Sequence, residues 1–144
     1  MRNRENLEVV KRNLMDSNVV IGLVGASSNP NKFGNIILHH MRNKGYDMRP
    51  INPRADSIDG IKSYATIQEL SDAATQSGKK LQALNFVLPS KLGANLIAEG
   101  IAAGVKDFWF QPGAEGEEVY QKAKESGITP VYIDCIMVEM PTKI

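Results

Sequence analysis

The sequence contains a single cysteine, Cys135, few aromatic residues and almost no net charge. One cysteine excludes an internal disulfide and a cysteine-rich metal cluster. The net charge of +1 gives no overall attraction to nucleic acid or anionic lipid. No hydrophobic run approaches the roughly 18 residues of a membrane span, and the first residues lack the apolar region of a signal peptide. We therefore expect a cytoplasmic protein that binds neither nucleic acid nor membrane.

The length of 144 residues predicts a single domain, 1–144. A chain of this size buries about two thirds of its unfolded surface, so it needs no metal or disulfide to form a core. Residues 1–16 contain Leu7, Val10 and Leu14 at helical spacing, which predicts an amphipathic helix that packs on the outside of this domain.

Apolar runs alternate with helical patterns along the rest of the chain. Expected strands lie near 19–24, 46–51, 61–64, 84–88, 106–110 and 131–133, and expected helices near 34–44, 66–74, 90–103 and 116–125. Residues 71–80 are polar and predict an exposed connection, and 54–60 predict a surface loop. Strands too apolar to face water favour an α/β fold with three layers: a Rossmann-like, doubly wound, mainly parallel sheet of five to six strands with helices on both faces.

The stretch IGLVGASSNPNKFGN, residues 21–35, is the most informative part of the chain. A buried strand stops at Gly25, and a loop rich in Gly, Ser, Asn and Pro leads to a helix that begins near Gly34. Small residues let a ligand approach the main chain, and the N–H groups and dipole at a helix start favour an anion. Lys32 adds a cation to this candidate anion site.

Two familiar phosphate motifs are absent from this stretch. Gly22, Gly25 and Gly34 are spaced too widely for G-x-G-x-x-G, and no Gly-Lys-Ser/Thr follows for a P-loop. A tight turn between strand and helix, without any ligand, remains an alternative interpretation of the same residues.

The topology indicates where a ligand would lie. In an open α/β sheet, ligands bind beyond the carboxyl ends of the strands, where the strand order reverses. The loops expected at that edge are 25–34, 52–54, 88–91 and, at the far side, 111–113, and all four are rich in Gly, Pro, Ser or Asn. This agreement between topology and composition favours a ligand site.

The end of the second expected strand bears on the ligand's identity. A nicotinamide cofactor requires an acid there for its ribose hydroxyls, but the strand ends in Asn52, Pro53 and Arg54. Asp47 falls at the start of that strand, on the wrong edge of the sheet. Arg54 suits a ribose phosphate, either the 2′-phosphate of NADP or the 3′-phosphate of coenzyme A, or it is a solvated loop arginine.

Several segments together resemble a known family. They are GLVGASSNPNKFG, PINP, FVLPS, IAAGVKDFWFQPG and Asp134-Cys135-Ile136, in this order between residues 18 and 140. This pattern resembles the small stand-alone CoA-binding proteins and the CoA-binding domains of the succinyl-CoA synthetase α subunit and of acyl-CoA synthetases. The chain has no counterpart of the phosphohistidine or ATP-grasp parts of the synthetases, so the resemblance implies no ligation chemistry.

The resemblance implies a set of ligand contacts. The CoA phosphates would lie against the first loop, the adenosine part beside the second, and the pantetheine arm near the last. The residues implied are Gly25, Ala26, Ser27, Ser28, Lys32, Gly34, Asn52, Pro53, Arg54, Leu88, Pro89, Ser90, Gln111, Pro112 and Gly113.

No residue of the sequence stands out as catalytic or metal-binding. His39 and His40 are neighbours on a helix and point about 100° apart, so they cannot act as a pair; we expect His40 in the core and His39 on the surface. Cys135 is best interpreted as a buried, inert thiol, with a mixed disulfide to bound CoA as the alternative. Trp109 and Phe110 are expected in the core.

These observations predict a protein that binds coenzyme A or an acyl-CoA through its nucleotide diphosphate part, without catalysis of its own. An NAD(P)-binding enzyme or nucleotide sensor on the same fold is the alternative. A third possibility is a subunit that binds a partner protein and no ligand. A partner enzyme or a homo-oligomer remains open in every case.

Overall fold

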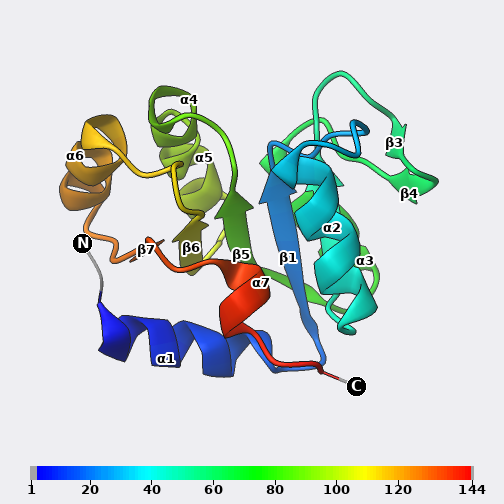
Figure 1. Ribbon diagram of the computed structural model, residues 1–144, viewed down its shortest axis with the longest axis horizontal. Helices are drawn as coiled ribbons and strands as arrows, with labels where there is room; N and C mark the ends of the chain where they lie inside the picture. The colour runs from blue at the N-terminus through cyan, green and yellow to red at the C-terminus, as the bar shows by residue number, and fades with distance from the viewer. Residues whose placement is uncertain (1–2, 144) are drawn as a thin grey trace.

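The computed structural model of the chain describes residues 3–143 (Figure 1). Seven helices and seven short or long strands follow one another in this part of the chain. The strands are β1 (Val19–Val24), β2 (Met48–Ile51), β3 (Ser57–Ile58), β4 (Ile61–Lys62), β5 (Lys80–Phe86), β6 (Asp107–Phe110) and β7 (Val131–Tyr132). The helices are α1 (Arg4–Leu14), α2 (Phe33–Asn43), α3 (Ile67–Gln76), α4 (Ser90–Ala94), α5 (Ile97–Ala102), α6 (Glu117–Ser126) and α7 (Ile136–Glu139).

Five strands form one parallel sheet in the order β2-β1-β5-β6-β7. The chain runs from β1 outward to β2, then crosses back over β1 to β5, so the strand order reverses between β1 and β5. All six residues of β1 are buried, as its unbroken apolar sequence requires in a central strand covered on both faces. The expected Rossmann-like α/β fold is confirmed.

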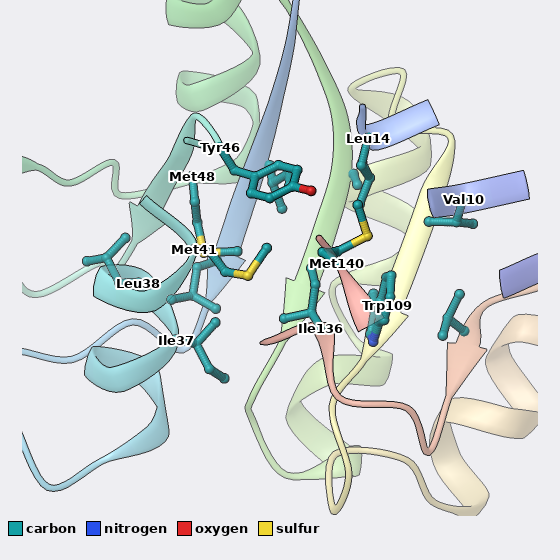
Figure 2. Packing of buried hydrophobic residues seen from close by; sticks show 14 of the residues in the cluster. Val10, Leu14, Ile37, Leu38, Met41, Tyr46, Met48, Trp109, Ile136 and Met140 are labelled. Carbon is teal, nitrogen blue, oxygen red and sulfur yellow. The ribbon is translucent and has the colours of Figure 1, made fainter. Parts of the chain in front are cut away.

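The face of the sheet that carries α2 is completed by the two ends of the described chain. Helix α1 contributes the buried Leu7, Val10 and Leu14, as its spacing predicted. Helix α7, which the sequence did not reveal, contributes Ile136. Figure 2 shows Ile136 and Met140 between the side chains of α2 and those of α1 and β6. Without α1 and α7, much of this face would be exposed.

The other face is covered by α3, α4, α5 and α6. Its core contains stacked aromatic rings, with the Phe86 and Phe110 centroids 4.4 Å apart. Trp109, on the α1 side, is fully buried and donates its indole N–H to the Asp134 carbonyl oxygen at 2.7 Å. The expectation that Trp109 and Phe110 belong to the core is confirmed.

Several local expectations differ from the structure. Helix α3 extends to Gln76 and β5 already begins at Lys80, so only a short turn remains of the connection expected at 71–80. The loop expected at 54–60 contains β3, which pairs with β4 in an antiparallel hairpin and buries Ile58 completely. The helix expected at 90–103 is divided into α4 and α5.

The expected orientation of α2 was also wrong in part. Ile37, Leu38 and Met41 are buried, whereas Ile36 and His40 are exposed. The apolar run Ile36 to Leu38 fits two helical phases, and packing against α1 and α7 selects the phase that turns His40 outward. No helix among residues 3–143 has the length and apolar character needed to cross a membrane.

Candidate functional site

A pocket of about 690 Å³ opens at the carboxyl edge of the sheet, where β1, β2 and β5 end. This is the edge at which the strand order reverses between β1 and β5. The pocket is lined by Val24, Gly25, Ala26, Ser27, Lys32, Ile51, Asn52, Pro53, Arg54, Ala65, Thr66, Ile67, Leu88, Leu92, Asn95, Leu96 and Glu99. The lining therefore combines apolar side chains with polar ones and with the two cations Lys32 and Arg54.

The turn after β1 depends on two glycines. Gly25 has a φ of +99°, and a Cβ there would lie 2.8 Å from Val87 Cγ2. At Gly34, in the first turn of α2, a Cβ would overlap the Gly25 carbonyl oxygen. The loop can lie this close to the start of α2 only because residue 34 lacks a side chain, and the turn at Gly25 fits against Val87 only because residue 25 lacks one.

Two asparagines fix the orientation of the peptide groups in this loop. Asn52 Nδ2 donates to the Ala26 carbonyl oxygen at 3.0 Å, and Asn35 Nδ2 donates to the Ser27 carbonyl oxygen at 2.9 Å. In a trans peptide the next N–H points the opposite way, so the Ser27 and Ser28 N–H groups point away from these amides. Neither N–H has an acceptor among residues 3–143.

The rest of the loop is held by its own side chains. Asn29 N–H donates to Ser27 Oγ at 3.0 Å, and Asn31 N–H donates to Asn29 Oδ1 at 3.0 Å. Asn52 also acts within its own turn, because its Oδ1 accepts from the Arg54 N–H at 2.8 Å. Both loops thus have a defined shape before any ligand is present.

The N-termini of two helices at the pocket differ in their capping. Helix α3 carries a capping box, in which Thr66 Oγ1 accepts from the Glu69 N–H and the Glu69 carboxylate accepts from the Thr66 N–H. Helix α2 begins after Lys32 with no side-chain cap and no acidic residue in its first turn. An uncapped helix start with a cation beside it favours an anion.

Charged groups lie on both sides of the pocket. Lys32 and Arg54 are exposed at its rim, and Glu99 lines the wall formed by α5. Beside the loop, hydrogen bonds from His39 and then from Asn35 lower the pKa of Asp59. Asp47 lies at the opposite end of β2, as expected, bonded to Arg49 and Lys79.

The structure brings together most residues implied for the first two loops. Those that line the pocket are Gly25, Ala26, Ser27, Lys32, Asn52, Pro53, Arg54 and Leu88. Ser28 and Gly34 belong to the same loop but do not contribute to the lining. Eight of the implied residues therefore lie together at one pocket.

The other five implied residues lie outside the pocket lining. Pro89 precedes α4, and Ser90 Oγ accepts from the Val119 N–H at 3.2 Å, so Ser90 serves the start of α6. Gln111 is buried; its Oε1 accepts from the Ile136 N–H and its Nε2 lies 3.3 Å from Cys135 Sγ. Pro112 follows Gln111, and the Gly113 N–H donates to the Glu115 carboxylate.

Sequence reasoning missed the wall that faces the loop. Leu92, Asn95, Leu96 and Glu99 come from α4, α5 and their junction, and the apolar spacing of the helix expected at 90–103 gave no reason to place its leucines outside the core. Leu92 is instead 52% exposed at the pocket. No local signal distinguishes a leucine beneath a ligand pocket from one in a core.

A second hollow, of about 560 Å³, lies near the start of β7, between the N-terminus of α1 and α6. Its wall includes Tyr120 and Tyr132, whose rings pack edge to face with centroids 4.9 Å apart. Burial, with a contribution from Tyr120, raises the pKa of Tyr132 to about 12. This hollow lies away from the carboxyl edge and brings together none of the predicted site residues.

Comparison with known proteins gives consistent results. A family model described as CoA binding domain matches residues 20–141. An uncharacterized protein of Bacillus subtilis, YneT, is 26% identical over 138 residues, which is 96% of each chain. A conserved hypothetical protein from Pyrococcus furiosus has a solved structure with 42% identity and a TM-score of 0.74, covering 83% of this chain and 97% of the other.

A larger enzyme shares the fold. The dinucleotide-forming acetyl-coenzyme A synthetase 1 of Ca. Korarchaeum cryptofilum, solved with phosphate and ADP, has a TM-score of 0.64 and 24% identity. The match covers 92% of this chain but 28% of the synthetase. At this identity the likeness shows the fold.

Proposed function

The chain belongs to the CoA-binding domain family, and we propose that it binds coenzyme A or an acyl-CoA through the nucleotide diphosphate part, in the pocket at the carboxyl edge of the sheet. The family supports a general CoA-binding role. The particular pocket, the orientation of the ligand and the absence of a catalytic step by this chain are our proposal. His39 and His40 lie outside the pocket lining.

The observation that carries this proposal is the orientation of the loop after β1. Asn52 and Asn35 hold the carbonyl oxygens of Ala26 and Ser27, and the N–H groups that follow, those of Ser27 and Ser28, have no acceptor in the described part of the chain. Together with the uncapped start of α2, these N–H groups suit the oxygen atoms of a diphosphate.

The pocket also has charged and apolar side chains that suit the phosphates and the adenine ring of the ligand. Lys32 and Arg54 supply cations for the diphosphate and for a ribose phosphate. The apolar side chains of Ile51, Ile67 and Leu96 suit the faces of an adenine ring. A protein of this kind would act in the cytoplasm, where CoA esters and a reduced Cys135 are expected.

NADP is the second candidate, because Arg54 would also suit a 2′-phosphate. Against this candidate, the residue that follows β2 is Asn52, and its Oδ1 already accepts from the Arg54 N–H. The ribose hydroxyls of a nicotinamide cofactor would therefore lack the usual carboxylate.

Thermal unfolding and calorimetric titration with CoA, acetyl-CoA, dephospho-CoA, NAD and NADP test the proposal. A ligand at about one hundred times its Kd stabilises the folded protein by about 2.7 kcal/mol, or roughly 2–8 °C. Stabilisation by CoA, and less by dephospho-CoA, would support the proposal. A response to NADP alone would favour the second candidate, and no response to any ligand would favour a partner-binding subunit.

A further inference from the structure

Side-chain hydrogen bonds connect the β3–β4 hairpin to the loop that follows β1. His39 Nε2 lies 2.6 Å from Asp59 Oδ2, and Asn35 Nδ2 donates to the same oxygen at 2.8 Å. Asn35 Nδ2 also donates to the Ser27 carbonyl oxygen at 2.9 Å. An amide nitrogen carries two hydrogens, so Asn35 makes both bonds at once and links Asp59 to Ser27.

The hairpin holds Asp59 in a fixed place. Ile58, the residue before it, is completely buried in the core on the α2 side. Asp59 and Gly60 form the tip, with φ values of +50° and +81°. Glycine or asparagine would form such a turn as readily as aspartate, so the turn alone does not require a carboxylate.

The charge of Asp59 does not favour a nearby anion either. Its carboxylate lies two hydrogen bonds from Ser27, where the phosphates are proposed to bind, and a negative charge there opposes a second one. The advantage of Asp59 must therefore come from geometry: its oxygen orients the Asn35 amide toward the Ser27 carbonyl. His39, when protonated, offsets the charge.

We propose that Asp59, held by His39, is a positioning residue of the ligand site. Through Asn35 it fixes the peptide group between Ser27 and Ser28, and so sets the affinity for the phosphate-bearing ligand. This inference rests on the proposed function, because it deepens the account of the same site. Asp59 itself does not line the pocket and is not expected to touch the ligand.

Asp59→Gly gives the sharpest test, because glycine keeps the positive-φ turn and removes only the side chain. We expect this variant to stay folded, with an unfolding temperature only a few degrees lower, and to lose about tenfold in CoA affinity because a charge-assisted hydrogen bond that orders the site is removed. In the ligand-free protein, amide hydrogen exchange at Asn29, whose N–H donates to Ser27 Oγ at 3.0 Å, should become faster, because the Ser27–Ser28 peptide group is released.

Two variants separate geometry from charge. Asp59→Asn keeps an oxygen for Asn35 and tolerates the positive φ, so CoA affinity should stay within about twofold of the wild type or increase. Asp56→Asn removes an exposed carboxylate from the same segment without any contact to Asn35, and should leave affinity and exchange unchanged.

Three results would overturn the inference. They are unchanged CoA affinity in folded Asp59→Gly, an equal loss in Asp59→Asn, and unchanged amide exchange at Asn29 in Asp59→Gly. If the wild type itself failed to bind CoA, the proposed function would fall, and the exchange data alone would then decide whether Asp59 orders the loop.

Discussion

Gly34 packs so closely on the Gly25 carbonyl oxygen that any Cβ at residue 34 would overlap it. The clash would be with main chain, which cannot rotate aside as a flexible side chain can. Gly34→Ala should therefore displace the loop after β1 from the start of α2.

We expect Gly34→Ala to cost about 2 kcal/mol or more of folding free energy, and to weaken CoA binding beyond detection in a calorimetric titration. Gly93→Ala is the matched control, because a Cβ there would make ordinary contacts with Phe110 and Phe86. If both variants bound CoA as the wild type does, the close approach at Gly34 would have no role in the site.

Asn52→Asp should weaken CoA binding by about tenfold, because the oxygen that replaces Nδ2 would face the Ala26 carbonyl oxygen and cannot donate to it. Titration of the variant with CoA measures this loss. Asn95→Asp introduces the same charge on the opposite wall of the pocket without touching the loop. A similar loss in Asn95→Asp would attribute the effect to charge and not to the lost hydrogen bond.

Arg54→Gln should show which phosphate of the ligand Arg54 contacts. If Arg54 binds the 3′-phosphate, its loss should weaken CoA by about fivefold or more and leave dephospho-CoA nearly unchanged, since an ion pair with a phosphate needs that phosphate. The preference for CoA should also decline with added salt. Arg12→Gln, on the exposed face of α1, serves as the control. Equal losses of affinity for CoA and dephospho-CoA would mean that Arg54 does not contact the 3′-phosphate.

The ion pairs of Asp47 predict how stability depends on pH. Burial alone would raise the pKa of Asp47, but its hydrogen bonds and attraction to Arg49 and Lys79 outweigh burial and lower the pKa. A pKa that is lower in the folded state stabilises the fold at pH values above the unfolded pKa, and this contribution disappears as pH falls through the folded pKa.

Asp47→Asn should therefore lower the unfolding temperature by about 2–4 °C at pH 7, corresponding to about 1 kcal/mol. The difference from the wild type should begin to shrink below about pH 4, where the carboxylate of the unfolded chain becomes protonated, and disappear as the pH falls through the lower pKa of the folded state. Calorimetric melting of both proteins from pH 7 to pH 3 measures this. A difference that stayed constant with pH would mean that the charge of Asp47 is not what stabilises the fold.

The sequence predicted the framework because each central strand is an apolar run too long to be accidental, as in Val19 to Val24. It predicted the start of α3 because Thr66 and Glu69 form a capping box from local residues alone. Helix α7 escaped prediction since only four residues form it, and Ile136 is buried by partners distant in the sequence.

The break between α4 and α5 likewise depends on tertiary packing. A Cβ at Gly100 would lie 2.8 Å from Phe108 Cε1, so α5 lies directly on the aromatic rings of the sheet. Such a contact is invisible in a sequence whose apolar spacing continues through 90–103.

For the site, topology sufficed where the loops directly follow β1, β2 and β5, as at Gly25, Asn52 and Leu88. Topology did not suffice for Gln111, because its side chain is buried and hydrogen-bonded to Asn85 and to the Ile136 N–H. The tertiary partners of a side chain, and not its place after a strand, decide whether it lines the pocket.

The meeting of α1 with α7 on one face of the sheet also affects how the chain is made. Lys11 of α1 pairs with Glu139 of α7 at 3.8 Å, and Lys143 Nζ donates to the Leu14 carbonyl oxygen at 3.0 Å. Helix α1, which is synthesised early, thus makes these contacts only after residues more than 120 positions later have been synthesised. During translation, the face with α3 to α6 can close first, while the face with α2 stays exposed to chaperones until residues 136–143 leave the ribosome.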